Sequence, residues 1–229
     1  MAAPVRDSEF LAFWEAGAGE HPLDRATLFA SWTDGVSRET VAGMTLDQRD
    51  RALFRFCSGC FGPSIELTLA CEECGEESEI AFAIADVLGT AAASDEFSIA
   101  HRGRELTCRQ PDSHDLASAI AADNPRRALL TRIVDTDDPD ETLLSAVEQQ
   151  MTEHAGLAAF SIANACPDCG HVTDTPFDIL DFVWKRVSTE ARRTLKDIDI
   201  LARAYGWSSS EILALSPQRR AAHIAMVQS

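Results

Sequence analysis

Two short motifs carry the residues with the clearest chemistry in this chain. Cys71-Glu72-Glu73-Cys74-Gly75 and Cys166-Pro167-Asp168-Cys169-Gly170 share the pattern C-x-x-C-G. A turn of this length presents two sulfurs to one ion, and the glycine allows the tight backbone that closes the turn. Four thiolates are the ligand set of a closed, tetrahedral structural zinc site, which leaves no position for water or substrate. The sequence therefore predicts a structural Zn²⁺ site formed by Cys71, Cys74, Cys166 and Cys169.

A third pair with the same spacing, Cys57 and Cys60, offers a rival ligand set with Cys71 and Cys74. That set would be local and would leave the second motif without a partner. We favour the pairs at 71/74 and 166/169, because each continues into glycine and lies between strand-like segments. Cys57 and Cys60 instead end a helix, before the turn Phe61-Gly62-Pro63. Cys108 lies in a predicted strand, where we expect it in the core.

The segments around the two motifs alternate between apolar and polar residues, which is strand periodicity. Ile65 to Leu69 and Ile80 to Ile84 flank the first motif, and Ala158 to Ala163 and Val172 to Phe177 flank the second. Each motif then closes a β-hairpin, and the two hairpins are halves of one zinc ribbon. Binding of that kind contributes roughly 10 kcal/mol to folding. We therefore expect a chelator, or Cys166→Ser, to destabilise the whole domain.

Other elements follow from apolar spacing and from helix start and stop signals. Residues 97–100 and 105–108 flank Gly103 and predict a hairpin, followed by three helical stretches. Thr45 and Gln48 have the spacing of a helix capping box. The predicted fold class is α+β: a split zinc ribbon with an inserted hairpin and helical segment, flanked by N-terminal helices and a C-terminal helical tail. The predicted regions are 1–63, 64–177 with the insertion 86–157, and 178–229.

Composition and charge narrow the possible partners. The net charge is −17, with −21 on residues 1–184 and +4 on residues 185–229. A strongly acidic body repels phosphate backbones, so general nucleic-acid binding is not favoured. No apolar run approaches the ~18 residues of a membrane span, and residues 1–7 lack the apolar stretch of a signal peptide. We therefore expect a cytoplasmic protein without a membrane partner, in which the cysteines are metal ligands or free thiols.

The sequence contains no arrangement typical of a catalytic site. Nucleophile-elbow, phosphate-loop and H-E-x-x-H patterns are absent, and the six histidines have no ligand spacing. We therefore predict no catalytic residues and no enzyme activity. One alternative is a thiol redox protein that uses Cys57 and Cys60 at a helix end, although the strand context of thioredoxin-like folds is missing.

The C-terminal tail combines a long helix, a glycine turn at Gly206 and a short helix that begins after Ser208. This spacing is similar to a helix-turn-helix, but the second helix, Glu211 to Leu215, is acidic and apolar, whereas a DNA reader carries Arg, Asn or Gln there. A second alternative is nevertheless a zinc-ribbon nucleic-acid adaptor that uses the basic residues Arg192, Arg193, Lys196, Arg219 and Arg220.

The tail also resembles a known family. Ile198 to Met226 reads as a helix with Leu201-Ala202, then Tyr205-Gly206-Trp207-Ser208, Glu211-Ile212-Leu213 and Arg219-Arg220. This pattern resembles the small baseplate-assembly proteins of T4-type contractile phage tails and their relatives in phage-tail-like contractile injection systems. Matching segments elsewhere are Arg49 to Leu53, Phe61 to Glu66, Phe177-Asp178 and Phe182 to Trp184. Cys57 and Cys60 lie outside the pattern, and His223 stands where an aromatic residue is expected.

The resemblance implies a non-enzymatic role. The expected function is an assembly factor or minor structural component of the baseplate of a contractile injection system. Its expected partners are baseplate or hub subunits of the particle. Tyr and Trp are favoured anchors at interfaces, so we expect the tail to dock a partner through Tyr205, Trp207, Arg219 and Arg220.

Overall fold

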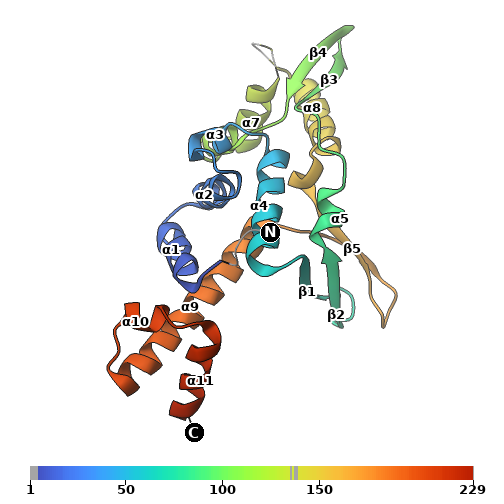
Figure 1. Ribbon diagram of the computed structural model, residues 1–229. Coiled ribbons are helices and arrows are strands. Elements are labelled where there is room, and N and C mark those ends of the chain that lie inside the picture. Colours follow the sequence, from blue (N-terminus) through green and yellow to red (C-terminus); the bar gives the residue numbers. More distant parts are fainter. Residues whose placement is uncertain (1–4, 135, 137–138, 229) are drawn as a thin grey trace. The chain divides into compact units, whose positions relative to one another are not determined.

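The computed structural model describes residues 5–134, 136 and 139–228 of the chain. It contains helices and small antiparallel hairpins, so the predicted α+β class is confirmed (Figure 1). Its contacts divide the chain into a central unit, residues 22–180, and a terminal unit, residues 1–21 and 181–229. This division differs from the predicted regions 1–63, 64–177 and 178–229, because the first helix belongs with the last ones.

The central unit is organised around helix α4, Leu46–Phe61, which follows α2, Pro22–Asp34, and α3, Arg38–Ala42. The expected capping box begins α4: the Thr45 hydroxyl accepts from the Gln48 N–H at 3.3 Å, and the Gln48 side chain accepts from the Thr45 N–H at 3.2 Å. The helix ends before Gly62, whose φ of 108° continues no helix. Its buried side chains include Leu53, Phe54 and Phe56.

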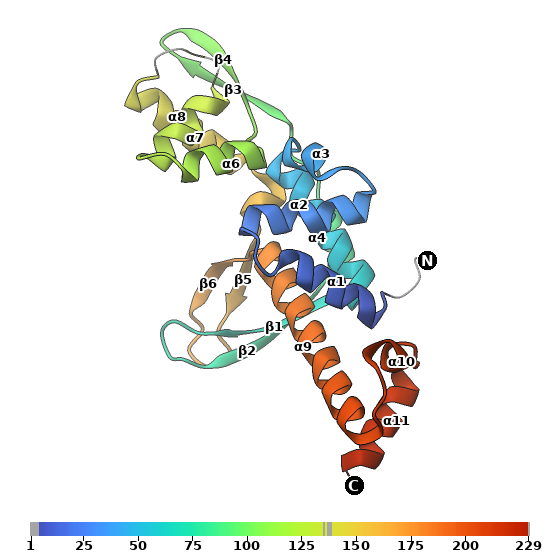
Figure 2. The same ribbon diagram turned by 90° about the vertical axis from the view of Figure 1, so that its left-hand side faces the viewer.

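Two hairpins follow α4 at different points of the chain. Strands β1, Ser64–Ala70, and β2, Glu77–Ala83, form the first, and β5, Ser161–Ala165, and β6, Val172–Pro176, form the second. They lie side by side, with their turns at the same end (Figure 2). At the other end four phenylalanines join them to α4, with ring centroids 5.7–6.2 Å apart: Phe54, Phe82, Phe160 and Phe177.

The strand expected over Ala158 to Ala163 begins later than predicted. Gly156–Ala159 is a 3-10 helix, η1, and β5 starts at Ser161. The cause is a contact that the local pattern does not show. The carboxylate of Asp47 on α4 accepts a hydrogen bond from the N–H of Leu157 at 2.7 Å, which holds this segment in a turn.

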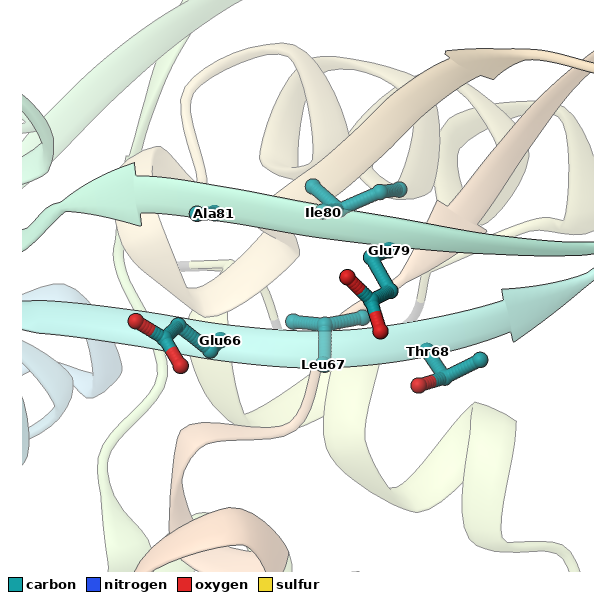
Figure 3. A pocket seen from close by; sticks show the side chains of 6 residues that line it. All are labelled: Glu66, Leu67, Thr68, Glu79, Ile80 and Ala81. Atoms are coloured by element: carbon teal, nitrogen blue, oxygen red, sulfur yellow. The ribbon is translucent and has the colours of Figure 1, made fainter. Parts of the chain in front are cut away.

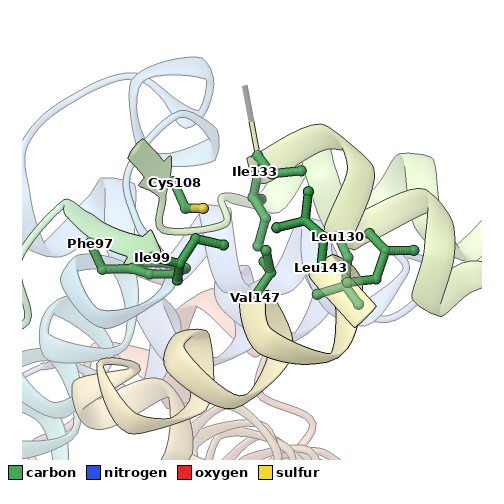
Figure 4. Packing of buried hydrophobic residues seen from close by; sticks show 9 residues of the cluster. Phe97, Ile99, Cys108, Leu130, Ile133, Leu143 and Val147 are labelled. Carbon is green, nitrogen blue, oxygen red and sulfur yellow. The ribbon is translucent and has the colours of Figure 1, made fainter. Parts of the chain in front are cut away.

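Between the two hairpins the chain forms a lobe with a core of its own. After α5, Ile84–Leu88, come the hairpin β3, Glu96–His101, and β4, Arg104–Arg109, and then the helices α6, Ser113–Ile120, α7, Pro125–Ile133, and α8, Glu141–Glu153. Figure 4 shows how side chains from β3, β4, α7 and α8 pack together. The buried members of this cluster are Phe97, Ile99, Cys108, Leu130, Ile133, Val134, Leu143, Leu144 and Val147.

A buried carboxylate ties the same lobe together. Asp115 on α6 is fully buried and accepts from Arg109 on β4 and from Arg132 on α7, the latter at 2.8 Å. Although desolvation opposes ionisation, the hydrogen bonds from these two guanidinium groups hold the pKa of Asp115 well below its usual range. The predicted insertion, a hairpin followed by three helical stretches, is therefore a lobe with its own buried core.

The terminal unit contains α1, Asp7–Gly17, most of α9, Ile179–Tyr205, and the short helices α10, Ser209–Leu213, and α11, Pro217–Gln228. The long helix predicted from Ile179 to Ala204 is confirmed, and Gly206 ends it with φ of 71°. Arg220 on α11 pairs with Asp7 on α1 and with Asp197 on α9, the latter at 3.3 Å. One guanidinium therefore ties both ends of the chain together.

Candidate metal centre

The first knuckle is a tight turn at the end of β1–β2. The N–H of Cys71 donates to the carbonyl of Glu76 at 2.8 Å, and the N–H of Gly75 donates to the carbonyl of Cys71 at 2.9 Å. Gly75 has φ of 78°, in the left-handed region that residues with a Cβ rarely adopt. The C-x-x-C-G pattern thus produces a turn in which both cysteines face the same side.

The second knuckle repeats this geometry. The N–H of Cys166 donates to the carbonyl of His171 at 2.8 Å, the N–H of Gly170 donates to the carbonyl of Cys166 at 3.0 Å, and Gly170 has φ of 72°. Two segments 92 residues apart therefore adopt the same turn, each at the end of a hairpin.

The two knuckles face each other and bring four sulfurs together. All four Sγ atoms lie within 4.8 Å of one another, and the closest pairs across the knuckles are Cys74–Cys166 at 3.5 Å and Cys71–Cys169 at 3.7 Å. Tetrahedral thiolate ligands bound at about 2.3 Å lie about 3.8 Å apart, so the donor set fits one ion. In each knuckle the first cysteine is buried and the second exposed. The predicted ligands Cys71, Cys74, Cys166 and Cys169 thus form a site that can hold a metal ion.

The electrostatics of the cluster also fit a cation. The N–H groups of Cys169 and Asp168 point at the Cys166 sulfur and lower the pKa of this thiol to about 7. At Cys74 the N–H of Glu76 has the same lowering effect, but hydrogen bonding to Cys166 and desolvation outweigh it and raise the pKa to about 12. Four thiols this close therefore do not all ionise without a positive charge between them, and a bound cation supplies that charge.

The remaining cysteines lie outside this cluster. Cys57 and Cys60 are in the last part of α4, and the metal-compatible group found among the described residues does not include them. Cys108 is fully buried in the core of the inserted lobe, where desolvation raises its pKa to about 11. The expectation that Cys108 is a core residue is confirmed.

The two aromatic residues predicted to bind a partner, Tyr205 and Trp207, lie against each other. Tyr205 and Trp207 stack with ring centroids 4.7 Å apart, and His223 packs edge-on against both rings, at 5.7 and 5.1 Å. Tyr205 keeps 40% of its surface exposed. His223, which stands where an aromatic residue was expected, packs against both rings, and Tyr205 remains partly accessible.

Arg219 and Arg220 differ in exposure although they are neighbours. Arg219 is exposed, whereas Arg220 is 2% exposed and is held by Asp7 and Asp197. Arg220 was predicted to bind a partner, but in this structure its guanidinium lies inside the terminal unit. Desolvation there lowers its pKa.

Sequence patterns missed two features of the central unit. The first is the pair Asp47 and Arg51 on α4: their side chains meet at 2.8 Å, and Arg51 also donates to the carbonyl of Ala91 at 2.8 Å. Their spacing of four residues on a face with apolar neighbours is the available signal. The second is a hollow of about 520 Å³ along β1–β2, which is lined by Glu66, Leu67, Thr68, Glu79, Ile80 and Ala81 (Figure 3).

Comparison of the chain with protein-family models, with curated proteins and with solved structures finds no match. Within the described ranges, none of the helices combines the length and apolarity needed to cross a membrane. The geometry of the four cysteines fits a zinc-ribbon-like site, in which they lie close enough to hold one metal ion.

Proposed function

We propose that this protein is a non-enzymatic assembly factor or minor structural component of a contractile, phage-tail-like injection system, with Zn²⁺ as a structural clasp. The observation that supports a structural metal site is that four cysteine sulfurs from segments 92 residues apart lie close together. Zinc is the metal that a closed set of four thiolates suits best among the common structural ions. Reduced cysteines of this kind are typical of the cytoplasm, where such particles are assembled.

The role in baseplate assembly rests on the resemblance of residues 198–226 and of the knuckle segments to that family. The aromatic group Tyr205, Trp207 and His223 supports it, because stacked rings with an exposed edge are suited to anchoring a partner. Exposed Arg219 on α11 is the polar candidate in the same tail. The proposed partners are baseplate or hub subunits.

The metal is tested by elemental analysis of the purified protein. We expect one zinc ion per chain and its loss in Cys166→Ser, whereas Cys60→Ser keeps it. A protein that holds no zinc when it is purified without chelator would contradict the clasp.

The assembly role is tested by affinity purification from a strain that makes the particle, followed by mass spectrometry. Baseplate subunits should copurify with the wild type and decrease with Trp207→Ala or Arg219→Ala. Arg104→Ala, which changes an exposed arginine on β4, is the matched control and should leave recovery unchanged. Recovery of nucleic acid without baseplate subunits would instead favour an adaptor.

A further inference from the structure

The charges of this chain are divided unevenly between its two units. The terminal unit has nine acidic and nine basic residues, so the whole net charge of −17 belongs to the central unit. Within the central unit, residues 66–79 hold six glutamates and no basic residue. Two exposed surfaces of opposite charge lie in different units.

The first surface, here called the acidic face, is the outward side of the β1–β2 hairpin. Side chains alternate along each strand, and the pairs Glu66 with Ala81, Thr68 with Glu79, and Ala70 with Glu77 all point to this side. All six residues are exposed. Figure 3 shows the carboxylates of Glu66 and Glu79 among the side chains that line the hollow.

The glutamates of the acidic face form no ion pair with another described residue. The residues between them are small: Thr68, Ala70 and Ala81. A partner can therefore approach the backbone closely between the carboxylates. The face offers three negative charges, Glu77 and Glu79 on β2 and Glu66 on β1.

The second surface, here called the basic ridge, lies along α9 in the terminal unit. Arg192, Lys196 and Arg203 are spaced by four and seven residues, which places them on one side of a helix. All three are exposed. Arg203 pairs with Asp199 at 2.7 Å, whereas Arg192 and Lys196 form no ion pair among the described residues.

The two surfaces match in spacing as well as in charge. Residues four apart on a helix are separated by about 6 Å along its axis, and residues two apart on a strand by about 6.6 Å. The Arg192–Lys196 step therefore fits the Glu77–Glu79 step. Arg203, about 10.5 Å further along α9, and Glu66, one pair further along the hairpin on β1, extend the two surfaces in the same direction without a matching distance. A contact of this kind joins unlike faces, so it continues from copy to copy unless a ring closes.

We propose that the acidic face of one copy binds the basic ridge of a second copy, so that the protein self-associates head to tail. This inference does not depend on the proposed role in baseplate assembly. The net charge of −17 opposes association at long range, but at about 0.15 M salt the Debye length is about 8 Å. Distant repulsion is then screened, while charges in direct contact still attract each other.

Sedimentation velocity over a range of protein concentrations tests this proposal at physiological salt. We expect the average mass of the wild type to rise with concentration. Charge reversal of the face, Glu66→Lys with Glu79→Lys, or of the ridge, Arg192→Glu with Lys196→Glu, should raise the concentration needed at least about tenfold. Glu105→Lys and Arg104→Glu on β4 each reverse one exposed charge elsewhere and should leave association near the wild-type level.

Mixing the two reversed variants is the decisive measurement, because the lysines on one then face the glutamates on the other. Association should return in the mixture at concentrations where each variant alone is still monomeric, and circular dichroism of each variant checks that it folds. A wild type that is monomeric at every concentration would overturn the proposal. A mixture that stays monomeric would also overturn it. So would an average mass that changes with salt but not with protein concentration.

Discussion

Among the glycines with positive φ, Gly156 is the one where an added Cβ would clash with a neighbouring side chain. Its φ is 57°, and a Cβ added there would lie 2.3 Å from the Oδ1 atom of Asp47. That carboxylate is buried and accepts from Leu157, Ala93 and Arg51 at 2.7, 3.2 and 2.8 Å. It therefore joins α4 to the segments before and after the inserted lobe, and Gly156 leaves the room that it needs.

Gly156→Ala should consequently cost more than backbone strain alone. We expect the free energy of unfolding of the central unit to fall by about 3 kcal/mol or more, since the alanine both adopts positive φ and displaces a buried, paired carboxylate. Urea denaturation measures this change. Gly103→Ala is the matched control: φ is 73° there, but nothing lies within 4 Å of the added Cβ, so about 1–2 kcal/mol is expected. Equal losses in the two variants would contradict this role of Asp47.

At the scale of elements, a buried ion-pair network helps to hold α11 in the terminal unit, beside the packing of His223 on Tyr205 and Trp207. Arg220 reaches α1 through Asp7 and α9 through Asp197, although these residues are far apart in the chain. Removing a buried charge leaves its partners without compensation, which is more costly than the loss of an exposed charge. Arg219, one residue earlier, is exposed and forms no such pair.

This difference predicts the outcome of two neighbouring substitutions. Arg220→Ala should destabilise the terminal unit by about 2–3 kcal/mol, because Asp7 and Asp197 are only partly exposed, while Arg219→Ala should change stability by less than about 0.5 kcal/mol. Tryptophan fluorescence during denaturation follows this unit through Trp14, Trp184 and Trp207. If both alanine variants unfold at the wild-type denaturant concentration, the ion pairs of Arg220 do not stabilise the terminal unit.

At the scale of the whole molecule, the metal site and the inserted lobe are separate sources of stability. The lobe has its own buried cluster and its own buried carboxylate, Asp115, and none of these residues belongs to the knuckles. The sequence led us to expect that loss of metal destabilises the whole domain. The structure refines this, because only the hairpins depend directly on the four cysteines.

Chelation of the full-length protein should therefore act unevenly. Hydrogen exchange of the backbone amides should become faster in residues 64–83 and 161–177, while α7, α8 and β3–β4 keep most of their protection. Mass spectrometry of the exchanged protein gives this map, and Cys166→Ser should reproduce it without chelator. Uniform loss of protection along the chain would mean that the lobe does not fold on its own core.

The sequence predicted those parts of the structure whose causes are local. A C-x-x-C-G motif carries its own turn, and Thr45 with Gln48 carries its own helix start, so the knuckles and α4 were found from spacing alone. Arg220 was misplaced because its burial depends on Asp7, 213 residues away. The start of β5 was misplaced because Asp47, 110 residues earlier, determines the turn before it. Contacts of this separation leave no pattern in one sequence.

Helices α1, α9 and α11 belong to one unit, although α1 is synthesised long before the other two. A ribosome makes residues 7–17 well before the rest of the terminal unit, because more than 160 further residues follow before residue 181. At about 5–20 residues per second this takes roughly 8–33 s. During that interval Phe10, Leu11 and Phe13, which are buried in the finished structure, have been made while most of their own unit has not. The central unit is therefore synthesised in full before α1 can join α9 and α11.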